Sequence, residues 1–261
     1  MSKTEKELAF LQDLYVTTDW TERFTDLLGK DFNTEEFEHI LYINAGTGNH
    51  ALALEETLEE NTELVAVTEN EELVKIAQAK AEAIKSDINF TALIPVKKFD
   101  AVIADASLVK SSELKDFMSK AAESSRWQIA FLLPTAGSFG DVFSYLWQVF
   151  FELEWLDKGA EIENLINEIP TVSRAKEIIK DLGFKKTEAK TKDEFFEFEN
   201  GTEFVESVLV RDFLLEDRLD FLSETEKEQV YEKLANTIDA ECEGLTFRFL
   251  VKATLITGAK G

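Results

Sequence analysis

A short polar turn in the first third of the chain carries the clearest sign of a ligand site. The sequence Asn-Ala-Gly-Thr-Gly-Asn at 44–49 follows an apolar run and precedes apolar residues at helical spacing. Glycines let a ligand approach the backbone closely, and the first turn of a following helix offers free N–H groups. Two glycines are a weak motif, so the segment is equally consistent with a tight strand-to-helix turn that binds nothing.

Two titratable residues near expected strand or helix ends are candidates for proton transfer. Asp105 closes the apolar segment 100–105, where it would orient an amine or hydroxyl substrate or act as a general base. The commoner role for such an aspartate is to cap a helix that follows Ser107. His50, just inside the first predicted helix, would stay neutral near the positive helix end and accept a proton, although such a residue is more often simply exposed.

The elements that must position these residues alternate between strands and helices. Five apolar runs are expected strands, at 40–43, 64–67, 88–93, 100–105 and 128–133. Helical periodicity fills the intervals at 51–58, 71–84 and 111–124. Apolar strands that alternate with helices predict a parallel sheet covered on both faces. Ligands of such sheets bind beyond the carboxyl ends of the strands, which is where the turn at 44–49 lies.

The rest of the chain is predicted to be mostly helical. Helices are expected at 5–16, 20–29, 139–156 and 161–182, and an acidic, mostly helical stretch at 193–240. A sixth strand is expected at 184–190 and a long final strand at 245–256. The aromatic stripe of 139–156 is interpreted as core packing, with a wall over an apolar or aromatic substrate as the alternative.

Composition excludes several classes of function. Of the 261 residues, 28 are Lys or Arg and 52 are Asp or Glu, a net charge of −24 that repels nucleic-acid phosphates. The single cysteine, Cys242, and two histidines make a cysteine- or histidine-based metal site unfavourable. The polar N-terminus has no apolar signal core, and no apolar stretch reaches membrane-spanning length. We therefore expect a cytoplasmic protein with neither a nucleic-acid nor a membrane partner.

Four segments carry a recognisable order of elements: Ile40–Asn49, Val65–Lys80, Phe99–Val109 and Trp127–Gly137. Together they resemble the class I S-adenosylmethionine-dependent methyltransferases, and the tail at 251–255 resembles the final antiparallel strand of that family. The resemblance covers about residues 36–261. It implies an α/β, Rossmann-like fold with a mostly parallel seven-stranded sheet, an antiparallel closing strand and a helical insert. The implied single domain has an N-terminal helical cap (1–35), a core (36–190), an acidic helical insert (191–245) and the closing strand (246–261).

The resemblance also implies a set of site residues. Cofactor contacts fall on Asn44, Ala45, Gly46, Gly48, Thr68, Glu69, Asp105 and Ala106, and Asp105 is the candidate catalytic residue; no metal is implied.

The chain departs from the family pattern at polar cofactor contacts. Tyr42 stands where the first motif has an acid, and Asn44 replaces its first glycine. Thr68 takes the place of the acid that binds both ribose hydroxyls, and Leu93 that of a polar residue near the adenine. Glu69 replaces the ribose-binding acid only if the second strand has already ended, because neighbours on a strand point to opposite faces.

Three hypotheses for function follow. The first is methyl transfer from S-adenosylmethionine to a small-molecule acceptor. The second is a methyltransferase-fold protein that has lost the cofactor and acts as a binding or scaffolding module; Tyr42, Thr68 and Leu93 support it. The third is a nicotinamide-dependent oxidoreductase, because 46–51 fits the Gly-x-Gly-x-x-Ala variant and Glu69 follows at a suitable distance. The sequence assigns no oligomeric state.

Overall fold

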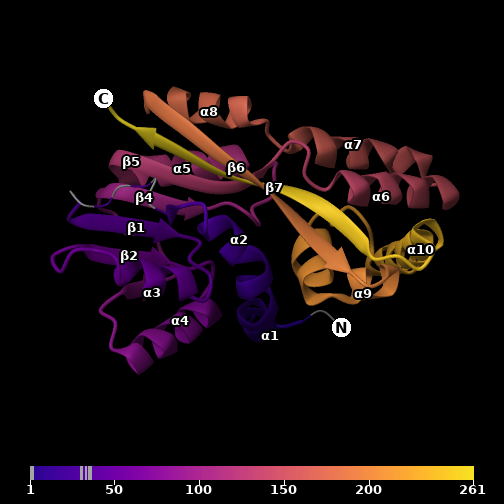
Figure 1. The fold of residues 1–261 in the computed structure, drawn as a ribbon, viewed down its shortest axis with the longest axis horizontal. Coiled ribbons are helices and arrows are strands. Elements are labelled where there is room, and N and C mark those ends of the chain that lie inside the picture. The colour runs from indigo at the N-terminus through magenta and orange to yellow at the C-terminus, as the bar shows by residue number, and fades with distance from the viewer. Residues whose placement is uncertain (1–2, 30–31, 33, 35–36) are drawn as a thin grey trace.

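The computed structural model describes residues 3–29, 32, 34 and 37–261, and its centre is a mixed β-sheet (Figure 1). The strands are β1 (His39–Ile43), β2 (Glu63–Val67), β3 (Asn89–Thr91), β4 (Phe99–Asp105), β5 (Ser125–Thr135), β6 (Lys186–Phe198) and β7 (Phe247–Ala259). Their order in the sheet is β3-β2-β1-β4-β5-β7-β6. Within the described residues, β7 alone runs antiparallel to its neighbours β5 and β6. The predicted fold class, a mostly parallel seven-stranded sheet with an antiparallel closing strand, is confirmed.

Central strands are buried on both faces because their residues are almost all apolar. In β1, Ile40 and Tyr42 face one hydrophobic cluster, and Leu41 and Ile43 face the other. Tyr42 pairs in register with residues of β2 and β4 on its two sides, so β1 lies in the middle of the parallel part. The carboxyl ends of β1, β2 and β4 consequently meet at one edge of the sheet, as expected for a ligand site in this architecture.

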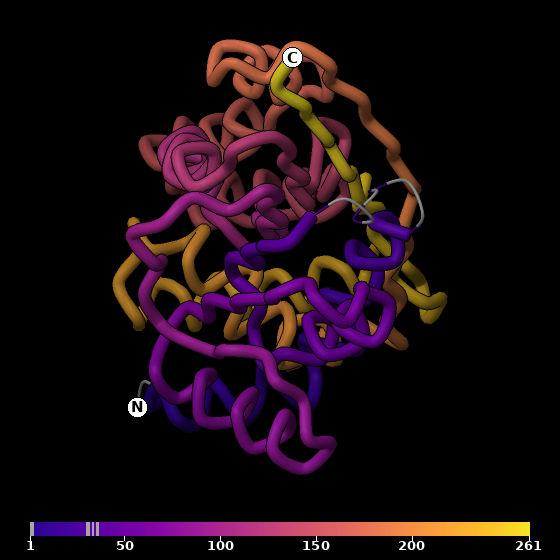
Figure 2. Tube along the Cα trace, turned by 90° about the vertical axis from the view of Figure 1, so that its left-hand side faces the viewer, coloured from indigo at the N-terminus to yellow at the C-terminus, as the bar shows by residue number. Residues whose placement is uncertain are grey.

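Helices cover the two faces unequally. The helical elements are α1 (Glu5–Leu11), η1 (Gln12–Thr21), α2 (Glu22–Thr25), α3 (Asn49–Glu55), α4 (Glu71–Ile84), α5 (Leu114–Ser124), α6 (Gly140–Glu152), η3 (Leu156–Lys158), α7 (Gly159–Glu168), α8 (Val172–Asp181), α9 (Gly201–Glu206), η4 (Leu209–Leu215) and α10 (Glu224–Cys242). Helices α5 and α8 pack on one face. The N-terminal helices, α3 and α4 pack on the other (Figure 1). The start of α1 and the end of β7 lie far apart in both the ribbon and the tube views (Figure 2).

The predicted acidic helical insert at 191–245 begins later than expected. Residues up to Phe198 extend β6, which pairs with β7 over its full length. The many Lys and Glu residues of β6 suggested a helix, but they suit the outermost strand of the sheet, whose face is largely exposed. Helical structure starts only at Gly201 with α9 and continues through η4 and α10.

The helical stretch expected at 161–182 is two helices. Helix α7 ends at Glu168 and α8 starts at Val172, with Pro170 between them. Proline disfavours helical geometry in the residue before it, and the Thr171 hydroxyl then caps α8 by accepting from the Arg174 backbone N–H at 3.1 Å.

Most aromatic residues of the β6–β7 ribbon, α6 and α9 pack in the core, although Phe151 and Phe195 are exposed. The β6–β7 ribbon extends past the end of β5 and carries Phe196, Phe247 and Phe249, all buried. Phe196 and Phe249 stack with ring centroids 5.2 Å apart, and Phe204 of α9 packs edge-on against Phe247 at 4.8 Å. This packing attaches the helical segment after β6 to the sheet. Figure 1 shows α9 and α10 at the right of the molecule.

Among the residues that the structure describes, no helix combines the length and the apolar character needed to cross a bilayer.

Candidate functional site

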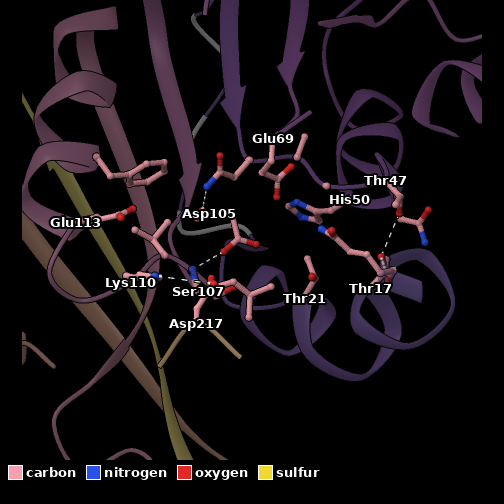
Figure 3. A pocket seen from close by; sticks show the side chains of 18 of the residues that line it. Thr17, Thr21, Thr47, His50, Glu69, Asp105, Ser107, Lys110, Glu113 and Asp217 are labelled. Carbon is pink, nitrogen blue, oxygen red and sulfur yellow. Dashed lines mark hydrogen bonds and ion pairs between the residues drawn. The ribbon is translucent and has the colours of Figure 1, made fainter. Parts of the chain in front are cut away.

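A polar pocket of about 690 Å³ lies where β1, β2 and β4 end (Figure 3). Its walls come from the turns after these strands, from helix η1 and from helix α5. The lining residues are Gln12, Thr17, Thr21, Asn44, Ala45, Gly46, Thr47, Asn49, His50, Glu69, Asp105, Ser107, Leu108, Val109, Lys110, Glu113, Asp116, Phe117, Lys120 and Asp217. The volume is in the range of small-molecule and cofactor sites.

The turn after β1 has a left-handed backbone at three positions, of which the first two line the pocket. Asn44 has φ 57° and Gly46 has φ 54°. Asparagine tolerates this conformation better than most residues, so Asn44 can occupy the position where the family resemblance predicts a glycine. Its side-chain Nδ2 donates to the backbone carbonyl of Asp105 at 3.0 Å, which ties the ends of β1 and β4 together. Asn44, Ala45 and Gly46, three of the predicted cofactor contacts, all line the pocket.

Gly48 serves packing and does not line the pocket. It has φ 85° and immediately precedes α3. A Cβ at this position would lie 2.9 Å from Cζ of Phe90 and 3.0 Å from Cβ of Ala77. Both the backbone angle and the close approach of α4 and β3 therefore require glycine here.

The residue that faces the pocket from the end of β2 is the acid Glu69, whereas Thr68 does not line the pocket. The strand ends at Val67, so the condition for Glu69 to face the site is met. Thr68 is buried and its hydroxyl donates to the Asn70 carbonyl at 3.1 Å, away from the pocket. Glu69 lines the pocket and is exposed to solvent there.

The electrostatic surroundings of Glu69 favour its protonated form. Desolvation by the surrounding protein, with a smaller contribution from Asp105, raises the pKa of Glu69 to about 7. Hydrogen bonds from its own backbone N–H, the Gln12 amide and the Gly46 backbone N–H oppose this rise.

Asp105 is a buried carboxylate at the end of β4. Its side chain accepts a hydrogen bond from the Ser107 backbone N–H at 2.8 Å, and burial raises its pKa to about 6. Helix α5 begins only at Leu114, so Asp105 closes a turn and does not cap a helix. Ala106 is buried and donates its N–H to the Leu132 carbonyl at 2.8 Å; it does not line the pocket.

Tyr42 and His50 form a buried pair beneath the turn. The Tyr42 hydroxyl and His50 Nδ1 are 2.9 Å apart, and Tyr42 is fully buried. Desolvation lowers the pKa of His50 to about 4, so the imidazole is neutral near pH 7. His50 is not simply exposed, as the commoner interpretation had it: it lines the pocket, and in Figure 3 its ring lies with Glu69 and Asp105 around the centre.

Sequence reasoning missed the contribution of helix η1. This ten-residue π-helix places Gln12, Thr17 and Thr21 in the pocket. The Thr17 and Thr47 hydroxyls lie 3.1 Å apart, and the Trp20 indole N–H donates to the Ser107 hydroxyl at 3.0 Å. The helix is thus attached to the turns after β1 and β4. The predicted helical cap at 1–35 therefore supplies pocket residues, although 1–2, 30–31, 33 and 35 lie outside the described part.

Two predicted features lie away from the pocket. Leu93 is 77% exposed on the loop between β3 and β4, and none of that loop lines the pocket. The aromatic stripe of α6 is largely buried in the core, and Phe117 of α5 is the only aromatic residue among the lining residues that the structure describes. No group of three or more potential metal ligands gathers anywhere in the described parts of the chain.

Comparison with solved structures identifies the fold. The YcgJ protein from Bacillus subtilis superposes with a TM-score of 0.58 and 14% identity, over 92% of this chain and 98% of that one. Phosphoethanolamine N-methyltransferase 2 from Haemonchus contortus, solved with phosphomonomethylethanolamine and S-adenosylhomocysteine, superposes with a TM-score of 0.55 and 11% identity, over 98% and 57%. The [4+2]-cyclase SpnF superposes with a TM-score of 0.51 and 16% identity, over 92% and 80%. No protein-family profile and no curated protein sequence matches the chain.

Proposed function

We propose that this protein, which has the class I methyltransferase fold, transfers a methyl group from S-adenosylmethionine to a small-molecule acceptor. The observation that carries the proposal is Glu69. A carboxylate directly beyond the second strand, open to a pocket of about 690 Å³, can accept hydrogen bonds from the two hydroxyls of a ribose. In this proposal Glu69 takes the role of the ribose-binding acid one residue later than in the family pattern, which answers the Thr68 departure; the departures at Tyr42 and Leu93 remain in favour of the degenerate hypothesis.

The other pocket residues also fit the cofactor. Gly46 lets a ligand approach the backbone of the turn, where a side chain would meet only the Gln12 amide at 3.2 Å. The carboxylates of Glu69 and Asp105 suit a ligand that carries positive charge. When bound, S-adenosylmethionine supplies an electrophilic methyl group on a sulfonium.

The protein's part in the reaction is to orient the reactants and exclude water. Asp105 is the residue we assign to the acceptor. With a pKa of about 6, its carboxylate is mostly ionised near pH 7 and can orient an amine or hydroxyl group or take its proton. The acceptor side is polar, lined by Ser107, Lys110 and Glu113. We therefore propose a small polar acceptor in place of the apolar or aromatic one that the α6 stripe suggested.

Calorimetric titration with S-adenosylmethionine, S-adenosylhomocysteine and NAD tests the proposal. We expect micromolar binding of the first two and none of NAD. The antiparallel β7 between β5 and β6 departs from the all-parallel sheet of dinucleotide-binding folds, which counts against the nicotinamide hypothesis. Binding of NAD alone would reverse this order of hypotheses.

A second candidate, a protein that binds the cofactor without transferring its methyl group, also has an observation in its favour. SpnF is described as a cyclase, so this fold also carries reactions other than methyl transfer. Binding of S-adenosylhomocysteine as tightly as S-adenosylmethionine, with no methylated product from any polar amine or hydroxyl acceptor, would favour this candidate.

A further inference from the structure

Lys80 of α4 joins three elements that meet at one end of the pocket. Its Nζ donates to the Asp13 carboxylate of η1. It also donates to Asn49 Oδ1, at the start of α3, at 2.5 Å and to the Thr47 hydroxyl at 3.2 Å. Thr47 and Asn49 line the pocket, whereas Lys80 does not. An ammonium has three N–H donors and no acceptor, so these three contacts use its whole hydrogen-bonding capacity.

The direction of hydrogen bonding between the two buried threonines beside Lys80 follows from their partners. The Thr17 and Thr47 hydroxyls lie 3.1 Å apart (Figure 3). Thr17 has a single hydroxyl proton, which it donates to the Gln12 carbonyl at 3.1 Å. Thr47 is therefore the donor to Thr17 and accepts in turn from Lys80. The chain of hydrogen bonds runs one way, from the ammonium to the backbone of η1.

Lys80 also determines which way the Asn49 amide points. An amide has an oxygen that accepts and a nitrogen that donates, and only the oxygen can face an ammonium. The Asn49 nitrogen is consequently turned away from Lys80, and it has no hydrogen-bond partner among the residues that the structure describes. Because Asn49 lines the pocket, its two N–H donors are available to a ligand there.

We propose that Lys80 is a positioning residue of the pocket, which turns the Asn49 amide so that its nitrogen donates to an acceptor oxygen of the bound cofactor. The inference rests on the proposed function. S-adenosylmethionine and its demethylated product both carry carboxylate and ribose oxygens, which accept hydrogen bonds. Without Lys80 an asparagine could present either end of its amide to the ligand, so the ammonium supplies the direction.

Asn49→Asp separates the two sides of this side chain. An aspartate keeps an oxygen toward Lys80 but lacks the N–H donors for the ligand. In calorimetric titration we expect S-adenosylhomocysteine to bind Asn49→Asp about tenfold more weakly than wild type, with unchanged unfolding free energy in urea. Asn61→Asp, at an exposed position before β2, adds the same charge and should match wild type in both measurements. Equal affinity of the two variants would overturn the inference.

Lys80→Met removes the ammonium donors and keeps the length of the side chain. Its control is Lys75→Met, because Lys75 is exposed on the same helix and pairs with Glu72. We expect Lys80→Met to bind S-adenosylhomocysteine about tenfold more weakly than wild type and Lys75→Met to bind it equally well. If Lys80→Met does not fold, Asn49→Asp still decides the question.

A double variant shows whether Lys80 acts through Asn49. Asn49→Ala should lose as much affinity as Asn49→Asp, and adding Lys80→Met to it should weaken binding little further, because the amide that Lys80 directs is already absent. A further loss of about tenfold, which is expected of independent contributions, would contradict the inference.

NMR reports on the amide itself. The Asn49 side-chain N–H signals, assigned by their absence in Asn49→Asp, should shift when S-adenosylhomocysteine is added to wild type. Signals that stay in place while the ligand binds would refute the inference and leave the proposed function intact. Failure of the wild type to bind would instead refute the proposed function, and the inference with it.

Discussion

At the scale of residues, the pocket combines two carboxylates with raised pKa values and one imidazole with a lowered pKa. Asp105 is buried, where a charge is costly, whereas Glu69 is exposed to the pocket; raised carboxyl pKa values are typical of residues that bind or react. His50 has the opposite shift, because burial favours the neutral ring. The Tyr42 hydroxyl gives that ring a partner where the family pattern has an acid.

The neutral state of His50 can be measured directly. The chain has two histidines, so His50→Gln assigns the imidazole signals in an NMR titration. We expect the His50 ring to titrate at about 4. Because the unfolded chain takes up this proton near pH 6.5, the stability that neutral His50 contributes is lost as pH falls from about 6.5 to about 4. A midpoint of about 6.5 in the folded protein would contradict the buried position of the ring.

Part of the pocket lining could be predicted from the sequence. The turn at 44–49 and Asp105 were indicated by the residues themselves, because turns after apolar strands converge in parallel sheets, and Glu69 was implied by the family resemblance. The choice between Thr68 and Glu69 depends on where β2 ends, and a boundary error of one residue reverses it. No sequence pattern indicated Gln12 as a pocket residue, because its helix is distant in sequence from β1, β2 and β4 and reaches the pocket only through tertiary packing.

At the scale of elements, the turn between β1 and α3 depends on close packing against α4 and β3.

The apolar strands were predictable because each is buried on both faces. The length of β6 was not predictable, because an outer strand with an exposed face can carry as many charged residues as a surface helix. The π-helix also could not be predicted, because its contacts with Thr47 and Ser107 are tertiary.

Gly48→Ala should show how tightly this turn is packed. The added methyl would lie 2.9 Å from Phe90 and would also require φ 85° in a non-glycine residue. Gly183 is the matched control, because it has φ 95° but nothing within 4 Å of its Cβ position. In urea denaturation we expect Gly48→Ala to lose about 2 kcal/mol more of unfolding free energy than Gly183→Ala. Equal losses would mean that α4 and β3 adjust at no cost.

At the scale of the whole molecule, the net charge of −24 opposes the compact state. Much of the acid lies on exposed faces, and the ion pairs there are partly solvated, so repulsion between like charges should dominate the salt response. Glu69 and Asp105 are two of the five acids that line the pocket and a small part of this charge, but they are the ones that our proposal places against a cationic ligand.

Added salt should therefore stabilise the protein. Between about 50 mM and about 500 mM sodium chloride, screening weakens the repulsion, and we expect the melting temperature to rise by about 3 °C. Potassium chloride at equal ionic strength is the control and should act alike. A melting temperature that falls with salt would show that surface ion pairs outweigh repulsion.

The affinity of S-adenosylhomocysteine for Glu69→Gln, relative to wild type, tests the central claim most directly. Glu60→Gln, an exposed glutamate before β2, is the matched control. We predict micromolar binding by wild type and by Glu60→Gln, and binding at least about tenfold weaker by Glu69→Gln, because an amide accepts the ribose hydroxyls less well than a carboxylate. Equal affinity in Glu69→Gln, or no binding by wild type at any pH between about 6 and about 9, would contradict the account.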